Sequence, residues 1–243
     1  MVTVGILTGA GSGARLGAGV PKALVPVGGV PMVRIAADNL FASGAVDEVV
    51  VTVPDGWQAE FAAALADIGQ PLTLVTGGET RQASISNALA QVSPGCTKVL
   101  VHDAARPFAP PSLIADVANA ITADTKAVIP ALPVTDTIKA VAPTRHSAAR
   151  SEATKIAESR RVVEVVTQTL NRESLRAVQT PQGFDRQTLE KAYLNAIGQQ
   201  LIATDDAGLV EALGIAVQTI PGAESAMKIT TPTDLKIAEL LYT

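Results

Sequence analysis

Short apolar runs alternate with segments of helical spacing along the first two-thirds of the chain, and this alternation limits most strongly how it can fold. The apolar runs are rich in Val, Ile and Leu at consecutive positions, which predicts strands buried on both faces. Such strands separated by helices are typical of a mostly parallel, twisted sheet with helices on both faces, so we predict the α/β class. The expected strands are Val2–Thr8, Val46–Val53, Leu72–Val75, Lys98–His102 and Lys126–Leu132, and the expected helices are Pro31–Ser43, Trp57–Ile68, Thr80–Val92 and Pro111–Thr122.

This rhythm breaks between Val134 and Leu175, where the chain becomes polar. Two segments in that stretch, Val134–Val141 and Val162–Leu170, have strand character, and Pro143–Arg161 between them is polar and could be a loop, a short helix or disordered. Because an isolated two-stranded arm is marginally stable in water, we expect it to project from the sheet and pack against a second copy of the chain. We therefore predict one domain over 1–243 with a dimerisation arm at about 134–174. The chain is expected to return to the core with helices at Asp185–Ile197 and Asp205–Leu213, a strand at Ile215–Ile220 and a last helix from Pro232.

Charge and composition argue against several classes of protein. Nineteen basic and 23 acidic side chains give a net charge of −4, which disfavours a nucleic-acid binder with a basic face. Four Phe, one Trp and two Tyr leave few rings for stacking bases. The single Cys96 excludes an internal disulfide framework, and two His leave little for a His-rich metal site. The chain shows no secretory signal and no apolar stretch of about 18–20 residues, so we expect a soluble, cytoplasmic protein with no membrane partner.

A glycine-rich loop, Thr8-Gly-Ala-Gly-Ser-Gly-Ala-Arg-Leu-Gly17, follows the first predicted strand and leads to Pro21-Lys22. Glycines let backbone N–H groups wrap an anionic group. The loop matches the dinucleotide fingerprint, which requires a carboxylate at the end of the next strand about 20 residues on. Here Asp38 falls within a predicted helix and the next strand ends only at Val53. It carries two cations instead, Arg15 and Lys22, which suit a triphosphate. A glycine-rich turn with two solvated cations is the structural alternative.

Two further clusters are expected at the carboxyl edge of the sheet, where open α/β sheets bind ligands. In Gly77-Gly-Glu-Thr-Arg-Gln-Ala-Ser84, Thr80 is a plausible N-cap that leaves Ser84 able to contact a base or ribose, unless the segment is an ordinary capped helix. In His102-Asp-Ala-Ala-Arg-Pro107, Asp103 could bind a ribose hydroxyl or Mg²⁺, and Arg106 could pair with a phosphate. A mutual Asp103–Arg106 salt bridge is the alternative, and His102 is expected to be structural.

These clusters, in this order, resemble the 2-C-methyl-D-erythritol 4-phosphate cytidylyltransferases of the non-mevalonate isoprenoid pathway. The resemblance continues over nearly the whole chain through Pro133–Lys139, Asn171-Arg172, Gln179–Gln182, Thr204–Ala207 and Met227–Thr230. It implies a Rossmann-like sheet, a homodimer formed through the arm, and transfer of CMP from CTP to a polyol phosphate with Mg²⁺ as cofactor.

The resemblance also implies roles for individual residues. Arg15, Lys22 and Lys228 would stabilise charge at the phosphates as the catalytic residues. The nucleotide-binding residues would be Ala10, Gly11, Gly13, Gly78, Ser84 and Asp103. Asp103 is also a candidate ligand of Mg²⁺, which the CTP phosphates would otherwise hold. The residues near the polyol phosphate would be Arg106, Thr137, Arg172, Thr180 and Thr204.

The chain departs from the family pattern at two places. Thr8-Gly9-Ala10-Gly11 stands where Pro-Ala-Ala-Gly is usual, so we expect altered turn geometry without loss of phosphate binding. The arm is also longer, because Pro143–Arg161 resembles an insertion.

Three other functions stay open from the sequence. A ribitol-5-phosphate cytidylyltransferase shares the loop, the His-Asp-Ala-Ala-Arg strand and the arm. An NAD-dependent Rossmann oxidoreductase would share only the sheet and the fingerprint match. A non-catalytic nucleotide-binding protein of the same fold would bind CTP and release no pyrophosphate.

Overall fold

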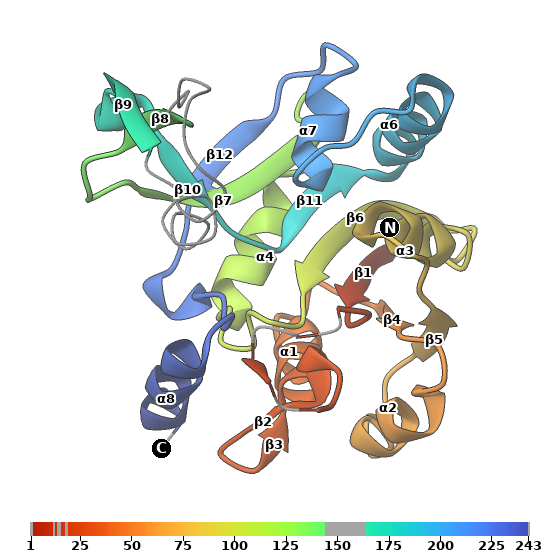
Figure 1. Cartoon of the computed structure of the whole chain (residues 1–243). Helices are drawn as coiled ribbons and strands as arrows, with labels where there is room; N and C mark the ends of the chain where they lie inside the picture. The colour runs from red at the N-terminus through yellow and green to blue at the C-terminus, as the bar shows by residue number, and fades with distance from the viewer. Residues whose placement is uncertain (1, 12, 14–15, 18, 144–163, 243) are drawn as a thin grey trace, which may run out of the picture. The chain divides into compact units, whose positions relative to one another are not determined.

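The computed structural model describes residues 2–11, 13, 16–17, 19–143 and 164–242. Contacts divide the chain into two compact units, 1–132 with 178–243, and 133–177. The first unit holds a central sheet in which β7-β11-β6-β1-β4-β5 follow one another and β12 also pairs with β7 (Figure 1). The strands are β1 (Val2–Thr8), β4 (Glu48–Val53), β5 (Leu72–Thr76), β6 (Cys96–Asp103), β7 (Ala127–Pro133), β11 (Gln182–Asp185) and β12 (Gln218–Pro221).

The sheet is mostly parallel, as predicted. The pairs β1–β4, β1–β6, β4–β5 and β7–β12 are all parallel. Strand β11 is the exception, because it runs antiparallel between β6 and β7, and no strand is expected there from the sequence. It has four residues and includes Gly183, where a Cβ would lie 2.6 Å from Val117 Cγ1. The glycine therefore lets helix α4 pack directly on the sheet.

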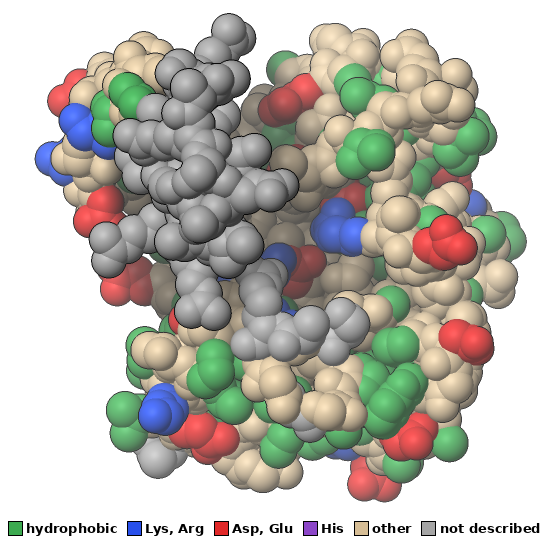
Figure 2. All heavy atoms as spheres, viewed as in Figure 1, with side chains coloured by type: hydrophobic (Ala, Val, Ile, Leu, Met, Phe, Trp, Pro, Cys, Tyr) green, Lys and Arg blue, Asp and Glu red, His purple; other side chains and the backbone are tan. Residues whose placement is uncertain are grey.

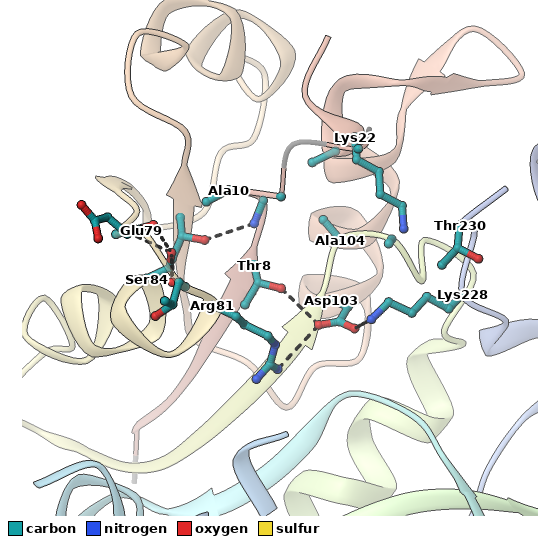
Figure 3. A pocket seen from close by; sticks show the side chains of 18 residues that line it. Thr8, Ala10, Lys22, Glu79, Arg81, Ser84, Asp103, Ala104, Lys228 and Thr230 are labelled. Atoms are coloured by element: carbon teal, nitrogen blue, oxygen red, sulfur yellow. Dashed lines mark hydrogen bonds and ion pairs between the residues drawn. The ribbon is translucent and has the colours of Figure 1, made fainter. Parts of the chain in front are cut away.

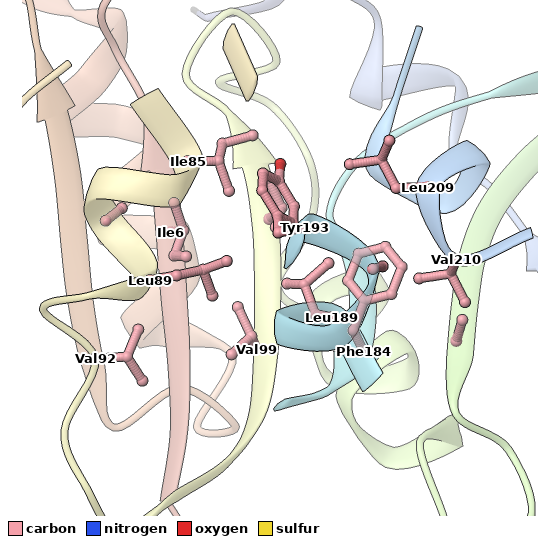
Figure 4. Packing of buried hydrophobic residues seen from close by; sticks show 14 of the residues in the cluster. Ile6, Ile85, Leu89, Val92, Val99, Phe184, Leu189, Tyr193, Leu209 and Val210 are labelled. Atoms are coloured by element: carbon pink, nitrogen blue, oxygen red, sulfur yellow. The ribbon is translucent and has the colours of Figure 1, made fainter. Parts of the chain in front are cut away.

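Helices cover both faces of the sheet, which confirms the predicted layers. One face packs α3 (Arg81–Leu89), α6 (Arg186–Gln199) and α7 (Asp206–Glu211) against strand residues such as Ile6 and Val99 (Figure 4). The other packs α1 (Met32–Ala42), α2 (Gln58–Ala64) and α4 (Pro111–Ala120) against Leu7, Val51 and Leu100. Successive side chains of a strand point to opposite faces of the sheet, so each apolar strand contributes to two separate apolar cores.

A third apolar cluster joins the two ends of the chain. The hairpin β2 (Pro26–Val27) and β3 (Val30–Pro31), which the sequence analysis does not anticipate, packs with α8 (Pro232–Leu241). Val25, Met32, Ile229 and Ala238 are buried together in this cluster. No helix in the described part of the chain is long and apolar enough to cross a membrane.

The second unit contains the segment predicted as an arm. Strands β8 (Lys139–Pro143) and β9 (Glu164–Thr169) pair antiparallel, with Val141 opposite Val166. The first strand begins five residues later than expected, and Val134–Thr137 is irregular. The 3₁₀ turn Arg172–Ser174 follows, capped by the Asn171 side chain, and β10 (Arg176–Val178) leads back to the first unit. Most of the predicted insertion, 144–161, lies outside the described residues.

Candidate active site

A pocket of about 500 Å³ opens at the carboxyl edge of the sheet, within the range of ligand sites. Its walls come from the glycine-rich loop after β1, from the turn between β5 and α3, from the end of β6, and from the segment before α8 (Figure 3). Of the predicted site residues, it is lined by Ala10, Gly11, Gly13, Lys22, Gly78, Ser84, Asp103 and Lys228. All three sequence clusters therefore meet in one place, as parallel strands that end at the same edge require.

The glycine-rich loop folds back onto Lys22. Lys22 N–H donates to Gly11 O at 3.3 Å, and Gly13 has a φ of +65°. A Cβ at Gly13 would lie 2.8 Å from Lys22 Cβ, so only glycine fits this conformation and this contact. The loop thereby sets where the Lys22 side chain starts. Arg15, predicted to act with it, lies outside the described residues.

Gly9 explains the departure at the base of the loop. Its N–H donates to Thr52 O at 3.0 Å and to Thr52 Oγ1 at 3.1 Å. A Cβ there would lie 2.7 Å from Thr52 O and 2.8 Å from Phe61 Cε1. The fully buried Phe61 ring occupies the space that an alanine methyl would need, so glycine and phenylalanine fit together at this position.

The turn between β5 and α3 is shaped by the Ser84 hydroxyl. This hydroxyl accepts a hydrogen bond from Gly78 N at 3.0 Å and donates to Thr80 O at 2.9 Å. Thr80 caps α3 by accepting from Ala83 N, as predicted. With both hydrogen-bonding roles taken by the backbone, Ser84 fixes the pocket wall on which a base would lie.

Asp103 lies at the centre of the pocket between two cations. Its Oδ2 is 2.6 Å from Lys228 Nζ and its Oδ1 is 3.6 Å from Arg81 Nη2. Thr8 Oγ1 also donates to Oδ1 at 3.2 Å. Burial disfavours the charged carboxylate, but Lys228 and Arg81 outweigh it and hold the pKa of Asp103 well below its usual range. The carboxylate is therefore ionised and fixes the end of the Lys228 side chain.

Lys228 is placed by its neighbour in the chain. Ile229 N–H donates to Ala105 O at 2.8 Å, and the Ile229 side chain is fully buried in the third apolar cluster. Lys22 and Lys228 point toward the same part of the pocket (Figure 3). Acidic and basic side chains also meet near the centre of the face drawn in Figure 2.

Arg106 lies outside the pocket lining and does not pair with Asp103. Its Nη1 donates to Ala226 O at 2.7 Å and its Nη2 to Val178 O at 3.2 Å. The guanidinium therefore ties the segment before Lys228 to the chain returning at Val178. The salt bridge considered as an alternative from the sequence is replaced by these carbonyl contacts.

Thr180 and Thr204 also lie outside the lining. Buried Thr180 accepts from Asp103 N at 3.0 Å, and its Oγ1 is 3.0 Å from His102 Nδ1. Thr204 is exposed and precedes the N-cap of α7. Thr180 therefore holds the end of β6 from behind the pocket.

Thr137 and Arg172 belong to the second unit. Both are exposed, and Arg172 Nη1 donates to Thr135 O at 2.5 Å. Their assignment to the second substrate stays a prediction.

Arg81 is a charged residue of the pocket lining that the sequence-based assignment misses. It is the first residue of α3, it lines the pocket, and its Nη2 is 2.7 Å from Asp206 Oδ2. Its position beside the Gly77-Gly78 turn is visible in the sequence, but its partner Asp206 lies 125 residues further along the chain. Local pattern therefore could not reveal the ion pair.

The profile of the 2-C-methyl-D-erythritol 4-phosphate cytidylyltransferase family matches residues 3–243. A relative of that name from Nocardia farcinica is 45% identical over 238 residues, covering 98% of this chain and 93% of the relative. The crystal structure of the Thermus thermophilus cytidylyltransferase is similar, with a TM-score of 0.74, 36% identity, and 99% and 98% of the two chains covered. The 4-diphosphocytidyl-2C-methyl-D-erythritol synthase structure from Anaerococcus prevotii has a TM-score of 0.80 at 27% identity, with 99% and 98% covered. These matches cover nearly the whole chain, and the pocket lies where the sequence predicts it. The chain therefore belongs to the 2-C-methyl-D-erythritol 4-phosphate cytidylyltransferase family.

Proposed function

We propose that this protein transfers CMP from CTP to 2-C-methyl-D-erythritol 4-phosphate and releases pyrophosphate. The observation that carries the proposal is the convergence of Lys22 and Lys228 on one pocket that the glycine-rich loop also lines, in a chain of this family. The glycine-rich loop would surround the triphosphate, and the wall formed by Gly78 and Ala10 would contact the cytosine. The family match over residues 3–243 favours this reaction over the ribitol and NAD alternatives.

The reaction joins two anions, so its main demand is cancellation of charge. An oxygen of the methylerythritol phosphate attacks the α-phosphorus of CTP and forms a new P–O bond. The bond from the α-phosphorus to the bridging oxygen breaks, and its electron pair leaves with pyrophosphate. The attacking oxygen is already ionised at neutral pH, so no general base is needed. Positioning and electrostatic stabilisation would supply the rate.

The two lysines would act at different parts of the nucleotide. Lys22 extends from the loop that would hold the triphosphate, which places it for the leaving pyrophosphate. Lys228 lies beside Asp103, where a ribose and the α-phosphate would approach. Asp103 would fix Lys228 and is itself neutralised by it, so that its charge does not repel the incoming anions.

We propose that Mg²⁺ is held by the CTP phosphates. Mg²⁺ commonly binds substrate phosphates with few protein ligands. Asp103 Oδ2 is engaged by Lys228, and Oδ1 by Thr8 and Arg81. Among the described residues no group of three or more His, Cys, Asp or Glu could enclose a metal. The residues present thus do not fit a protein-held ion with Asp103 as its ligand.

A pyrophosphate-release assay tests the proposed function. We expect release with CTP and methylerythritol phosphate together, and little with UTP, ATP or GTP. Ribitol 5-phosphate serves as the matched acceptor, and a reaction without any acceptor is the control. Faster release with ribitol 5-phosphate would move the protein to the other cytidylyltransferase class, and CTP binding without release would make it a non-catalytic binder.

We also propose a homodimer formed through the hairpin β8–β9. Val141 and Val166 lie opposite each other on this two-stranded element and are 46% and 54% exposed. An exposed apolar pair on a hairpin that is too small to be stable alone favours burial against a partner.

We further propose a cytoplasmic location, in keeping with a nucleotide substrate and a free, buried Cys96.

Light scattering on the purified protein should give the mass of two chains, and Val166→Asp should give the mass of one. The charge would be buried without a partner if the valine lies in the interface. Ile202→Asp is the matched control, because Ile202 is 90% exposed in the first unit. A monomeric wild type, or a dimer that survives Val166→Asp, would contradict the role of the hairpin.

A further inference from the structure

A line of polar contacts runs from the interior of the protein to the centre of the pocket. Tyr193 OH donates to Asp206 Oδ1 at 2.5 Å, and Asp206 Oδ2 accepts from Arg81 Nη2 at 2.7 Å. Arg81 Nη2 is in turn 3.6 Å from Asp103 Oδ1, and the other oxygen of Asp103 holds Lys228. These residues come from α6, α7, α3 and β6 and from the segment before α8.

The inner half of this line is buried. Asp206 is 1% exposed and Tyr193 is 3% exposed, whereas the Arg81 side chain is 36% exposed and lines the pocket. A buried carboxylate is costly unless it is paired, and here each of its oxygens has a partner. Burial and the Asp206 charge both raise the pKa of Tyr193 above its ordinary value, so the phenol stays protonated and remains a donor.

The arrangement restricts how Arg81 can move. With Oδ1 held by Tyr193, the Asp206 carboxylate cannot turn, and its Oδ2 presents one fixed acceptor to Arg81. Burial disfavours the charged guanidinium, but Asp206 and then Asp103 outweigh it and raise the pKa of Arg81 above its ordinary value. Arg81 therefore remains a cation that pairs mainly with Asp206. Its Nη2 stays 3.6 Å from Asp103, whose closer partner is Lys228 at 2.6 Å.

Resting on the proposed function, we propose that Asp206 and Tyr193 are positioning residues: they hold Arg81 back from Asp103, so that Asp103 keeps Lys228 in place at the reacting phosphate. If Asp206 released Arg81, the guanidinium would move onto Asp103 and compete with Lys228 for it. Lys228 would then be less well placed when charge develops in the transition state. A small misplacement of a catalytic group lowers the rate of the chemical step more than it weakens substrate binding.

The first test compares kcat with KM in Tyr193→Phe and Asp206→Asn. We expect kcat to fall about 10-fold in the first and about 10- to 100-fold in the second, with the KM for CTP changed less than about threefold. Tyr242→Phe is the matched control, because Tyr242 is the chain's other tyrosine and lies outside the pocket lining. Thermal melting identifies any loss that comes from unfolding.

A double-mutant cycle with Lys228→Ala distinguishes positioning from a general structural role. If Tyr193 acts through Lys228, adding Tyr193→Phe to Lys228→Ala should lower kcat by less than about twofold. An independent structural effect would again lower it about 10-fold. Equal losses in both backgrounds, or an unchanged kcat in Tyr193→Phe and Asp206→Asn, overturn the proposal while the wild type stays active. A wild type that releases no pyrophosphate overturns the proposed function and this role with it.

Discussion

Replacement of Lys228 by alanine should lower kcat about 10²–10³-fold, which is the scale for removal of one preorganised electrostatic group. Lys228 Nζ is 2.6 Å from Asp103 Oδ2 in the pocket, and its charge would stabilise the α-phosphate as the new bond forms. The alanine variant loses that charge and also leaves the Asp103 carboxylate, 11% exposed, with less compensation. Both effects oppose the approach of two anionic substrates.

Steady-state pyrophosphate release measures this effect. Lys236→Ala is the matched control, because Lys236 is an exposed lysine on α8 outside the pocket lining, and it should keep wild-type kcat. Lys228→Arg should recover part of the loss by restoring the charge with a different shape. A Lys228→Ala enzyme with near-wild-type kcat would remove this residue from the mechanism.

Lowering the pH from about 6.5 to about 4 should destabilise the protein through His102 by roughly 3 kcal/mol. His102 is fully buried, and burial lowers its pKa from 6.5 to about 4. In this pH window the unfolded chain binds a proton that the folded protein does not. The stability contributed by the neutral imidazole is therefore complete above the unfolded pKa and is lost as the pH falls toward the folded one.

Urea unfolding at several pH values measures this loss. In His102→Gln the side chain cannot titrate, so the free energy of unfolding should fall less steeply between pH 6.5 and 4 than in the wild type. The comparison is between slopes, because the substitution itself also changes the stability at neutral pH. Parallel slopes in the two proteins would show that His102 titrates at its ordinary pKa.

The sequence predicts the layers of the fold well, because strands buried on both faces carry Val, Ile and Leu at consecutive positions. Helix starts are also predictable where a side chain caps them, as Thr80 and Asp205 do. Strand β11 escapes prediction because four residues with an internal glycine carry little periodicity. Its place in the sheet is set by contacts with β6 and β7, which are distant in sequence.

In the candidate site too, some features can be predicted from the sequence and others cannot. The lining by Gly11, Gly78 and Asp103 follows from their positions after strands that end at one edge. The partners of Arg81 and Arg106 do not follow, because a guanidinium at a strand or helix end can reach several acceptors. Asp206 and the carbonyls of Ala226 and Val178 become neighbours only when the chain has folded.

The distance between Lys22 and Lys228 depends on the packing of α8, because α8 shares an apolar cluster with the hairpin β2–β3. Val25 lies three residues after Lys22, Ile229 directly follows Lys228, and Ala238 of α8 is buried with both. The two cations come from opposite ends of the chain, yet their backbones rest on one common support. A substitution that disturbs the packing of α8 should therefore also displace the two lysines relative to each other, although no residue of that helix lines the pocket.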